Sequence, residues 1–239
     1  MALLARMMSQ DMVYFLYNHN LVAFIFFSCT WLVCFKYLKA LKHLKQTMSK
    51  KNKQLLSSCS HYFVIDTETT GLHHPKPISV ALVHCAVSDD NENTMDVYYE
   101  KEWYISDWLD NIEPETINFL NIDLEKIRAC AIPFSDFCKQ VDEYIQSLDK
   151  SERAALTFVA HNAQFDRNVL SNAGYSPPYP WFCTMAQHCA RQSFKCKFPK
   201  LIELAQYHHV LCDFSKCHNA LYDAQICAEI LFRMILIDH

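Results

Sequence analysis

Glycine is almost absent from this chain of 239 residues. The chain contains two glycines, whereas average usage would give roughly 17. Each one therefore marks a position where the backbone needs unusual freedom. Gly71 directly follows an Asp/Glu pair, where a tight turn has to bring the backbone close to a ligand. Gly174 follows a helical pattern over residues 163–173 and predicts the end of that helix.

No C-x-x-C pair occurs, although the chain has 12 cysteines. In a chain of this length without regular cysteine spacing, free thiols in a reducing compartment are favoured over a disulfide scaffold. One loop holds a possible zinc cluster formed by His208, His209, Cys212, Cys217 and His218. The loop is short and His218 has another role, so zinc binding is the less favoured interpretation.

An uninterrupted apolar run of membrane-spanning length is also missing near the N-terminus. Residues 21–35 carry no charge, but a spanning helix needs about 20 residues. Continuing to Leu38, with the Lys36 ammonium directed to the lipid surface, brings the run near that limit. The lysine-rich segment 36–53 that follows has the pattern of a basic amphipathic helix.

Three interpretations of this N-terminal part differ in what they require. We favour a single membrane anchor whose lysines hold the C-terminal side in the cytoplasm. A hairpin packed on the enzyme or on a partner is the alternative. A cleaved signal peptide is disfavoured, because the basic flank follows the apolar run and no small-residue cleavage site is evident.

The charges also divide the chain into two parts. Residues 1–55 contain eight Lys or Arg and one Asp, whereas the remainder contains 14 Lys or Arg and 25 Asp or Glu. Such asymmetry suggests parts with different partners. We therefore predict a hydrophobic anchor with a basic linker over residues 1–59, and a catalytic domain over residues 60–239.

The first chemical motif follows a short apolar run, Tyr62–Ile65, which predicts a buried strand that stops at Asp66. Asp66 and Glu68 are two positions apart, so on an extended backbone both side chains point to the same side. Two like charges directed at one point repel each other unless a cation lies between them. Carboxylate oxygens favour Mg²⁺ or Mn²⁺ over zinc. Taken alone, the stretch could equally be a strand end whose polar residues meet solvent.

The remaining hydrophobic pattern predicts a mixture of strands and helices. We expect strands over residues 78–87, 95–104, 155–160 and 182–185, and helices near residue 114 and over residues 133–148, 163–173, 200–209 and 219–237. Asn162 and Thr184 are expected to cap the helices that follow them. Three successive strands, followed by alternating helices and strands, predict an α/β sheet covered by helices.

Two later motifs complete a recognisable pattern. Phe158–Asp166 is a strand that runs into an acidic helix start, and His218–Ala224 has the form H-x-A-x-x-D. Together with the first motif, they resemble the DEDDh exonucleases of the DnaQ-like superfamily, which includes the epsilon proofreading subunit of bacterial DNA polymerase III. The three motifs occur in the family's order between Ser60 and the C-terminus, and such a three-part match is specific.

The resemblance implies a fold and a chemistry. The fold would be a ribonuclease H-like mixed sheet flanked by helices. Two Mg²⁺ ions, or Mn²⁺, would be held by four carboxylates: Asp66, Glu68, Asp166 and Asp223. His218 would act as the general base, a task suited to imidazole near neutral pH. The reaction would be metal-dependent 3′→5′ release of nucleoside 5′-monophosphates from single-stranded DNA or RNA ends.

The spacing of the last motif separates its two functional side chains. His218 and Asp223 are five positions apart, which places them some 140° apart around a helix. They cannot share a helical face. We therefore expect His218 in the turn before the last helix and Asp223 inside that helix.

Substrate contacts are predicted from the same resemblance. Residues after the first carboxylate contact the terminal nucleotide in the family, and the matching positions are Thr67, Thr69 and Leu72; Asn162 is a further candidate. Leu72 is either a wedge against a base or an ordinary core leucine. A basic and aromatic stretch is either a strand-binding rim or a solvated loop: Arg167, Arg191, Phe194, Lys195, Lys197, Phe198 and Lys200.

One position departs from the family. Members commonly carry Ile-Glu-Ile after the first motif, whereas this chain has Ile78-Ser79-Val80. That glutamate is not one of the motif carboxylates, so the departure bears on the subfamily more than on activity.

Three functions are compatible with this pattern. The first is an exonuclease on single-stranded ends; the second is a relative that trims RNA or short oligoribonucleotides. Discrimination of the 2′-hydroxyl depends on pocket contacts that a sequence does not expose. The third is a membrane-anchored nucleic-acid-binding module without catalysis, which would have no need of an intact carboxylate set. No polymerase-binding tail follows the last predicted helix, so no polymerase partner is identified.

Overall fold

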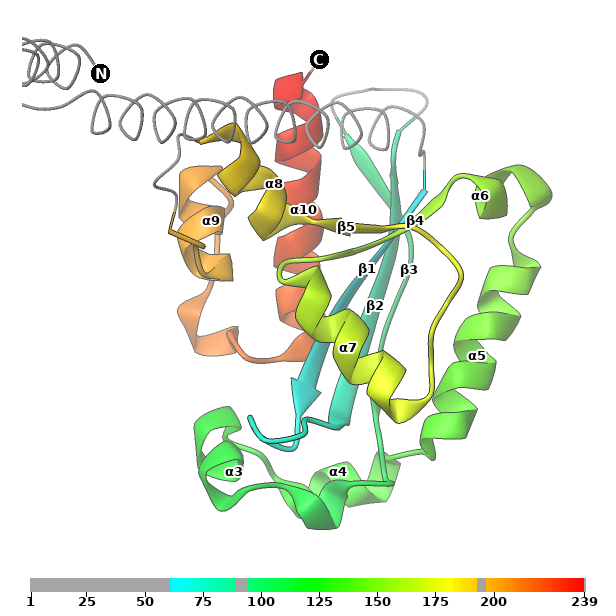
Figure 1. The fold of residues 1–239 in the computed structure, drawn as a ribbon, viewed down its shortest axis with the longest axis vertical. Coiled ribbons are helices and arrows are strands. Elements are labelled where there is room, and N and C mark those ends of the chain that lie inside the picture. Colours follow the sequence, from blue (N-terminus) through cyan, green and yellow to red (C-terminus); the bar gives the residue numbers. More distant parts are fainter. Residues whose placement is uncertain (1–60, 89–93, 193–196, 239) are drawn as a thin grey trace, which may run out of the picture. The chain divides into compact units, whose positions relative to one another are not determined.

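A computed structural model of the chain describes residues 61–88, 94–192 and 197–238. These residues contain a five-stranded sheet in the order β3-β2-β1-β4-β5 (Figure 1). The strands are β1 (His61–Thr69), β2 (Pro77–Val87), β3 (Met95–Tyr104), β4 (Leu156–Ala160) and β5 (Trp181–Cys183). The first three are antiparallel neighbours, β4 is parallel to β1, and β5 is parallel to β4. The predicted mixed sheet is confirmed.

Helices surround this sheet. They are η1 (Leu109–Asn111), α3 (Pro114–Leu120), α4 (Leu124–Cys130), α5 (Phe134–Ser147), α6 (Lys150–Ala154), α7 (Ala163–Ala173), α8 (Thr184–Arg191), α9 (Leu201–Tyr207), η2 (Phe214–Lys216) and α10 (Ala220–Asp238). The sequence pattern predicted the principal helices, but it missed the short elements η1, α4, α6 and η2. In Figure 1, α3 and α4 lie at the end of the sheet where β1 stops.

The central strand β1 divides its side chains between two layers of helices. Tyr62 and Val64 pack with residues of α10 on one face. Phe63 and Ile65 point the other way, into a core that includes residues of α5 and Leu170 of α7. Burial of one such side chain contributes about 1.5–3 kcal/mol. Because helices cover both faces, Tyr62–Ile65 of β1 and Val80–Val83 of β2 are continuous buried apolar runs.

β1 continues past the position where the sequence predicted its end. Asp66 pairs with Ala81, and Glu68 pairs with Ser79, so β2 supports the strand as far as Thr69. The prediction that the strand stops at Asp66 is therefore wrong. β4, in contrast, pairs with β1 only over residues 61–64. The carboxylates of β1 thus lie beyond the end of β4, at the edge where α7 begins.

The turn after β1 depends on Gly71. Its φ of +154° is a conformation that other residues rarely adopt. A Cβ added at this position would collide with the carboxyl group of Glu113, which immediately precedes α3. The backbone N–H of Glu113 also donates to the carbonyl of Thr70 at 2.8 Å. The turn at Gly71 therefore places the start of α3 beside the end of β1.

The two predicted helix caps are corrected in detail. Asn162 occupies the N-cap position of α7, but its side chain makes no capping hydrogen bond. Thr184 is the first residue of α8, and Cys183 before it is the N-cap, with its sulfur accepting from the backbone N–H of Ala186. Gly174 ends α7 in the left-handed conformation, as predicted.

The predicted anchor and linker, residues 1–59, lie outside the described residues. Within the described part, no helix combines the length and the apolar character that a bilayer crossing requires.

A cluster of aromatic rings lies at the opposite end of β1 from its carboxylates. His84 of β2 is 1% exposed. One of its ring nitrogens lies 3.0 Å from Nδ1 of His61, and the other lies 2.8 Å from the hydroxyl of Tyr144. Burial, followed by the neighbouring His61, lowers the pKa of His84 to about 4.

This buried histidine predicts a loss of stability in acid. Unfolded His84 takes up a proton as the pH falls from 6.5 towards 4, whereas the folded residue stays neutral over that range. The resulting loss is roughly 3 kcal/mol. Urea unfolding at neutral and at mildly acidic pH should show a weaker pH dependence for His84→Gln, which keeps polar contacts without titrating. An equal pH dependence in both proteins would contradict this account.

Candidate active site

Four carboxylates from three elements meet where β1 ends. Asp66 and Glu68 lie on β1, Asp166 in the first turn of α7, and Asp223 in the first turn of α10. Asp66 and Glu68 continue the alternation that turns every second β1 side chain towards α10. Thr67 points to the other face, where its hydroxyl donates to Oδ1 of Asp166 at 2.9 Å.

Burial raises the pKa of each of these carboxyl groups, and neighbouring negative charges add to the effect at Asp66 and Glu68. Burial, followed by the charges of the other three, holds the pKa of Asp66 well above its usual range. The pKa of Glu68 rises to about 8 through burial first, then through the charges of Asp223 and Asp166. Burial raises the pKa of Asp166 to about 7, against the lowering effect of the Thr67 hydrogen bond. Burial also raises the pKa of Asp223, and His218 opposes it.

This donor set fits hard divalent cations. Its ligand atoms are carboxylate oxygens, which suit Mg²⁺ or Mn²⁺. The raised pKa values show that the ionised groups repel one another, and a cation between them would offset that repulsion. The three sequence motifs contain all four carboxylates, and in the structure these carboxylates lie together at the end of β1.

His218 lies in the turn before α10, where the spacing of the motif predicted it. Its φ is +66°, and its backbone N–H donates to Oδ2 of Asp223 at 3.1 Å. Ligand atoms of Glu68, His218 and Asp223 all lie within 4.8 Å of one another. The residue is exposed. An imidazole with access to solvent therefore lies directly beside the carboxylates.

The zinc alternative gains no support from the geometry. Among the described residues, the one group of three or more His, Cys, Asp or Glu side chains close enough to share a metal ion is Glu68, His218 and Asp223. The sulfurs of Cys212 and Cys217 lie 3.9 Å apart. His208 is buried elsewhere, with its ring near the ring of His188 on α8.

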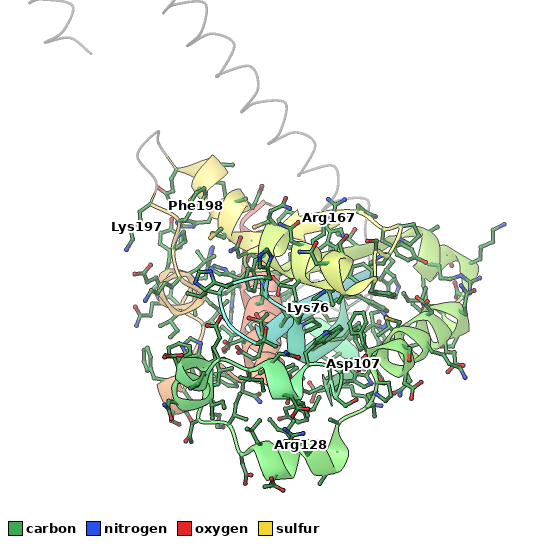
Figure 2. All side chains as sticks on the ribbon, turned by 60° about the horizontal axis from the view of Figure 1, so that its bottom comes forward. Lys76, Asp107, Arg128, Arg167, Lys197 and Phe198 are labelled. Carbon is green, nitrogen blue, oxygen red and sulfur yellow. The ribbon has the colours of Figure 1, made fainter. Side chains whose placement is uncertain are left out.

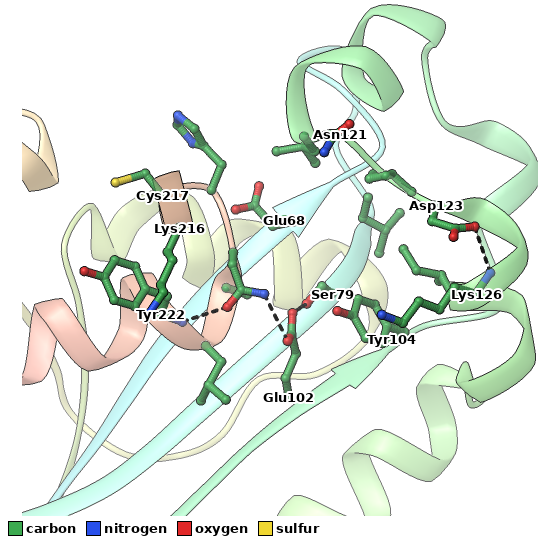
Figure 3. Close-up of a pocket in the computed structure, with 18 of the residues that line it drawn as sticks. Glu68, Ser79, Glu102, Tyr104, Asn121, Asp123, Lys126, Lys216, Cys217 and Tyr222 are labelled. Atoms are coloured by element: carbon green, nitrogen blue, oxygen red, sulfur yellow. Dashed lines mark hydrogen bonds between the residues drawn. The ribbon is translucent and has the colours of Figure 1, made fainter. Parts of the chain in front are cut away.

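A cleft of about 710 Å³ opens beside the acidic centre (Figure 3). Its walls come from the ends of β2 and β3, from α3 and α4, and from the turn that carries His218. Phe119 of α3 is 65% exposed, and its ring centroid lies 4.5 Å from that of the His218 imidazole. Lys126 and Lys216 contribute positive charge to the walls. An exposed ring can stack on a base, and lysines can pair with phosphates.

The predicted substrate residues lie in different environments. Leu72 is 86% exposed, so the alternative that it is a core leucine is wrong. Thr67 is buried and bonded to Asp166, which makes it a support for that carboxylate. The hydroxyl of Thr69 donates to the carbonyl of Gly71 at 3.1 Å. Asn162 is exposed at the start of α7. Contact of these residues with a nucleotide stays a prediction.

The predicted basic rim is not a single patch. Figure 2 shows Lys197 and Phe198 at one end of the molecule, with Arg167 well apart from them along α7. Phe194 and Lys195 lie outside the described residues. Lys197 pairs with Glu203 at 3.8 Å. These basic and aromatic residues therefore do not form one continuous rim, and their contact with a nucleic-acid strand stays a prediction.

Two residues beside the site were missed in the sequence. Phe119 lies on the short helix α3, and the sequence of that helix gave no reason to expect this aromatic residue at the site. Glu102 of β3 accepts a hydrogen bond from the hydroxyl of Ser79 at 2.6 Å, and its charge contributes to the raised pKa of Glu68. The only signal in the sequence was the alternation of charges in Glu100-Lys101-Glu102, which is typical of any solvent-facing strand.

The repulsion among the carboxylates predicts how a cation should affect stability. Raised pKa values mean that the metal-free fold loses stability as the pH rises from about 4 to 8. Mg²⁺ or Mn²⁺ at 100-fold excess over Kd should contribute about 2.7 kcal/mol, or roughly 5–10 °C in Tm for a chain of this size. Thermal unfolding should show a larger increase at pH 8 than at pH 5, because protons compete for the same oxygens.

Asp66→Asn is the matched variant for that measurement. It removes one of the repelling charges, so the metal-free variant should be more stable than wild type at pH 8. It should also lose most of the metal-dependent increase. A pH-independent metal effect, or a variant that retains the full increase, would contradict the site.

Comparison with known proteins places this geometry among nucleases. The profile of the family described as "3'-5' exoribonuclease Rv2179c-like domain" matches residues 61–235. Ribonuclease T of Actinobacillus pleuropneumoniae serotype 5b (strain L20) is 24% identical over 182 residues, which are 72% of this chain and 82% of that protein. Ribonuclease T of Histophilus somni (strain 129Pt) is 26% identical over 181 residues, with the same coverage.

Solved structures share the fold. The nuclease domain of 3'hExo, a DEDDh family member bound to rAMP, aligns with a TM-score of 0.62 at 15% identity, over 76% of this chain and 94% of that one. Cell-death related nuclease 4 aligns with a TM-score of 0.59 at 16% identity. The match covers 75% of this chain and 65% of that one. The predicted ribonuclease H-like layout is confirmed.

Proposed function

Because this chain belongs to the family of 3'-5' exoribonuclease Rv2179c-like domains, we propose that it shortens single-stranded RNA from the 3′ end and releases nucleoside 5′-monophosphates. It is a 3′-5′ exonuclease of the DEDDh type, a class that uses divalent metal ions. The observation that carries the proposal is that Glu68, Asp223 and His218 lie together beside an open cleft, with Asp66 and Asp166 close enough to interact electrostatically with them. We favour RNA over DNA as the substrate because the matching family and the similar ribonuclease T proteins are named for RNA.

Hydrolysis breaks the bond between phosphorus and the 3′ oxygen of the preceding nucleotide, and it forms a new bond from a water oxygen to phosphorus. Two divalent ions bound by Asp66, Glu68, Asp166 and Asp223 would activate that water and stabilise charge on the leaving oxygen. The products are a 5′-monophosphate and a strand with a new 3′-hydroxyl group.

The chain's own residues hold the site and move the proton. Thr67 holds the Asp166 carboxylate by its hydrogen bond, and Asp223 accepts from the backbone of His218. An imidazole nitrogen of His218 takes the proton of the attacking water. Because His218 is exposed, that proton can then pass to bulk solvent.

The walls of the cleft supply substrate contacts. We assign stacking of the terminal base to Phe119, whose ring lies at the side of His218. Lys126 and Lys216 are suited to the phosphates by charge. Thr69, the last residue of β1, Leu72 in the turn after it, and Asn162 at the start of α7 remain predicted contacts.

Removal of the proposed ligands or base should abolish or strongly reduce release of mononucleotides. Asp166→Asn should leave no measurable activity with Mg²⁺ or Mn²⁺, and chelation with EDTA should do the same. His218→Ala should lower kcat by roughly 10²–10⁴-fold. Mononucleotide release from a 3′-labelled single strand measures all three.

Glu143→Gln is the control for these variants. Glu143 is an exposed carboxylate on α5 that pairs only loosely with Lys139, at 3.8 Å. It should retain wild-type activity. Normal activity in Asp166→Asn would refute the assignment of the metal site, and normal activity in His218→Ala would refute that of the base.

Phe119→Ala should weaken substrate binding. Stacking of one base on an aromatic ring contributes about 1–3 kcal/mol, so KM should rise roughly 5–150-fold while kcat changes less. Phe214→Ala is the control, because Phe214 is 61% exposed but is not part of the cleft wall. Matched RNA and DNA strands of one sequence, compared by kcat/KM, test the substrate class. Faster hydrolysis of DNA would overturn the preference for RNA and leave the exonuclease assignment intact.

A further inference from the structure

We propose that Glu102 is a positioning residue that holds the turn carrying His218 against the sheet, through the side chain of Asn219. The inference rests on the proposed function, since it assigns Glu102 a role in aligning the general base. No motif of the sequence contains Glu102. It lies on the edge strand β3, far from the four ligands along the chain.

The carboxylate of Glu102 links two elements (Figure 3). Its Oε1 accepts from the hydroxyl of Ser79 at 2.6 Å, which fixes the side chain against β2. Its Oε2 accepts from Nδ2 of Asn219 at 3.3 Å. Ser79 is 3% exposed, so the first of these bonds is protected from water. The second bond joins the sheet to the residue directly after His218.

The turn before α10 requires such support. His218 has a φ of +66°, which is uncommon for residues other than glycine and costs free energy. Asn219 stabilises the turn with both ends of its amide. Its Oδ1 accepts from the backbone N–H of Tyr222 at 3.0 Å and caps α10. Its Nδ2 donates to Glu102, so one side chain fixes the turn both to its own helix and to β3.

Loss of this bond would change the position of His218 more than its chemistry. The backbone bond from His218 to Asp223 and the cap at Tyr222 lie within the turn and α10. The bond to Glu102 is a link from the turn to the sheet that carries Asp66 and Glu68. It therefore sets the distance between the base and the carboxylates. Misplacement of a catalytic group by about 1 Å can cost on the order of 100-fold in rate.

The fold contains a matched control for this link. Gln225 of α10 donates from Nε2 to Oε2 of Glu100 at 2.9 Å. That bond also joins an amide of the α10 region to a carboxylate of β3, but it lies beyond the turn. Glu100→Leu therefore removes the same kind of contact between the same two elements without touching the base.

The experiment compares variants of the full chain on a single-stranded RNA. Glu102→Leu removes the acceptor oxygens for Ser79 and Asn219, and it should lower kcat roughly 10–100-fold with KM little changed. Asn219→Ser keeps a capping oxygen but is too short to reach Glu102, and it should show the same loss. Glu100→Leu should remain close to wild type. Asn219→Asp sets a second carboxylate against Glu102 and should also lose activity; adding Glu102→Gln to it exchanges donor and acceptor, re-forms the bond, and should recover most of the activity.

Two further measurements separate positioning from other roles. In a His218→Ala background, Glu102→Leu should cause no additional loss, because its effect passes through His218. Amide hydrogen exchange over residues 217–223 should accelerate in Glu102→Leu and not in Glu100→Leu. This exchange measurement does not depend on nuclease activity, so it still tests the proposal if the wild-type chain hydrolyses no nucleic acid.

Three outcomes would overturn the proposal. A full additional loss in the His218→Ala background would mean that Glu102 acts on the carboxylates directly. Equal losses from Glu102→Leu and Glu100→Leu would mean that both bonds only stabilise the fold. Unchanged exchange over residues 217–223 in Glu102→Leu would mean that the turn is held without Glu102.

Discussion

The structure depends on holding four carboxylates, Asp66, Glu68, Asp166 and Asp223, together at the end of β1. Burial opposes the ionised form of all four, and like charge adds to this at Asp66 and Glu68. A flexible chain would relieve that repulsion by moving the groups apart. Here each group is fixed to the end of a strand or the first turn of a helix, and the elements themselves are held by a core on both faces of the sheet.

The alternation of side chains along β1 determines which groups meet at the site. The same period of two that buries Tyr62 and Val64 against α10 directs Asp66 and Glu68 towards Asp223. The opposite phase directs Thr67 towards Asp166 of α7. Asp166 and Asp223 both lie in the first turn of a helix, where the helix dipole favours negative charge. The packing of the core and the positions of the carboxylates therefore depend on the same alternation of side chains, and a shift in the register of β1 would change both.

The sequence predicted the parts of this site that are local. Asp66 and Glu68 follow from a spacing of two on a strand, and the placement of His218 outside α10 follows from its spacing of five to Asp223. The large helices and the antiparallel strands were predicted from the spacing of apolar residues along the chain. The strand end at Asp66 was predicted wrongly, because pairing with β2 extends β1 and the sequence of β1 alone does not contain that pairing.

Contacts that depend on long-range packing could not be found in this way, even where the residue itself, such as Thr67, had been predicted to lie at the site. Phe119 reaches His218 because the turn at Gly71 lets α3 approach the end of β1. Thr67 supports a carboxylate 99 positions later in the chain. Each of these contacts depends on how whole elements pack, and no spacing along the chain records it.

Ser79 shows how such a contact changes the interpretation of a single position. In the resemblance to DEDDh exonucleases, Ser79 stands where relatives commonly carry a glutamate, which suggests a lost acidic group. In the structure, the hydroxyl of Ser79 bonds to the carboxylate of Glu102 from the neighbouring strand. An acidic group therefore does reach this place, and it comes from β3 instead of β2. A serine is short enough to leave room for that carboxylate, whereas a glutamate at position 79 would add a second negative charge beside Glu68. The serine at position 79 and Glu102 on β3 therefore belong to one arrangement, in which β3 supplies the acidic group.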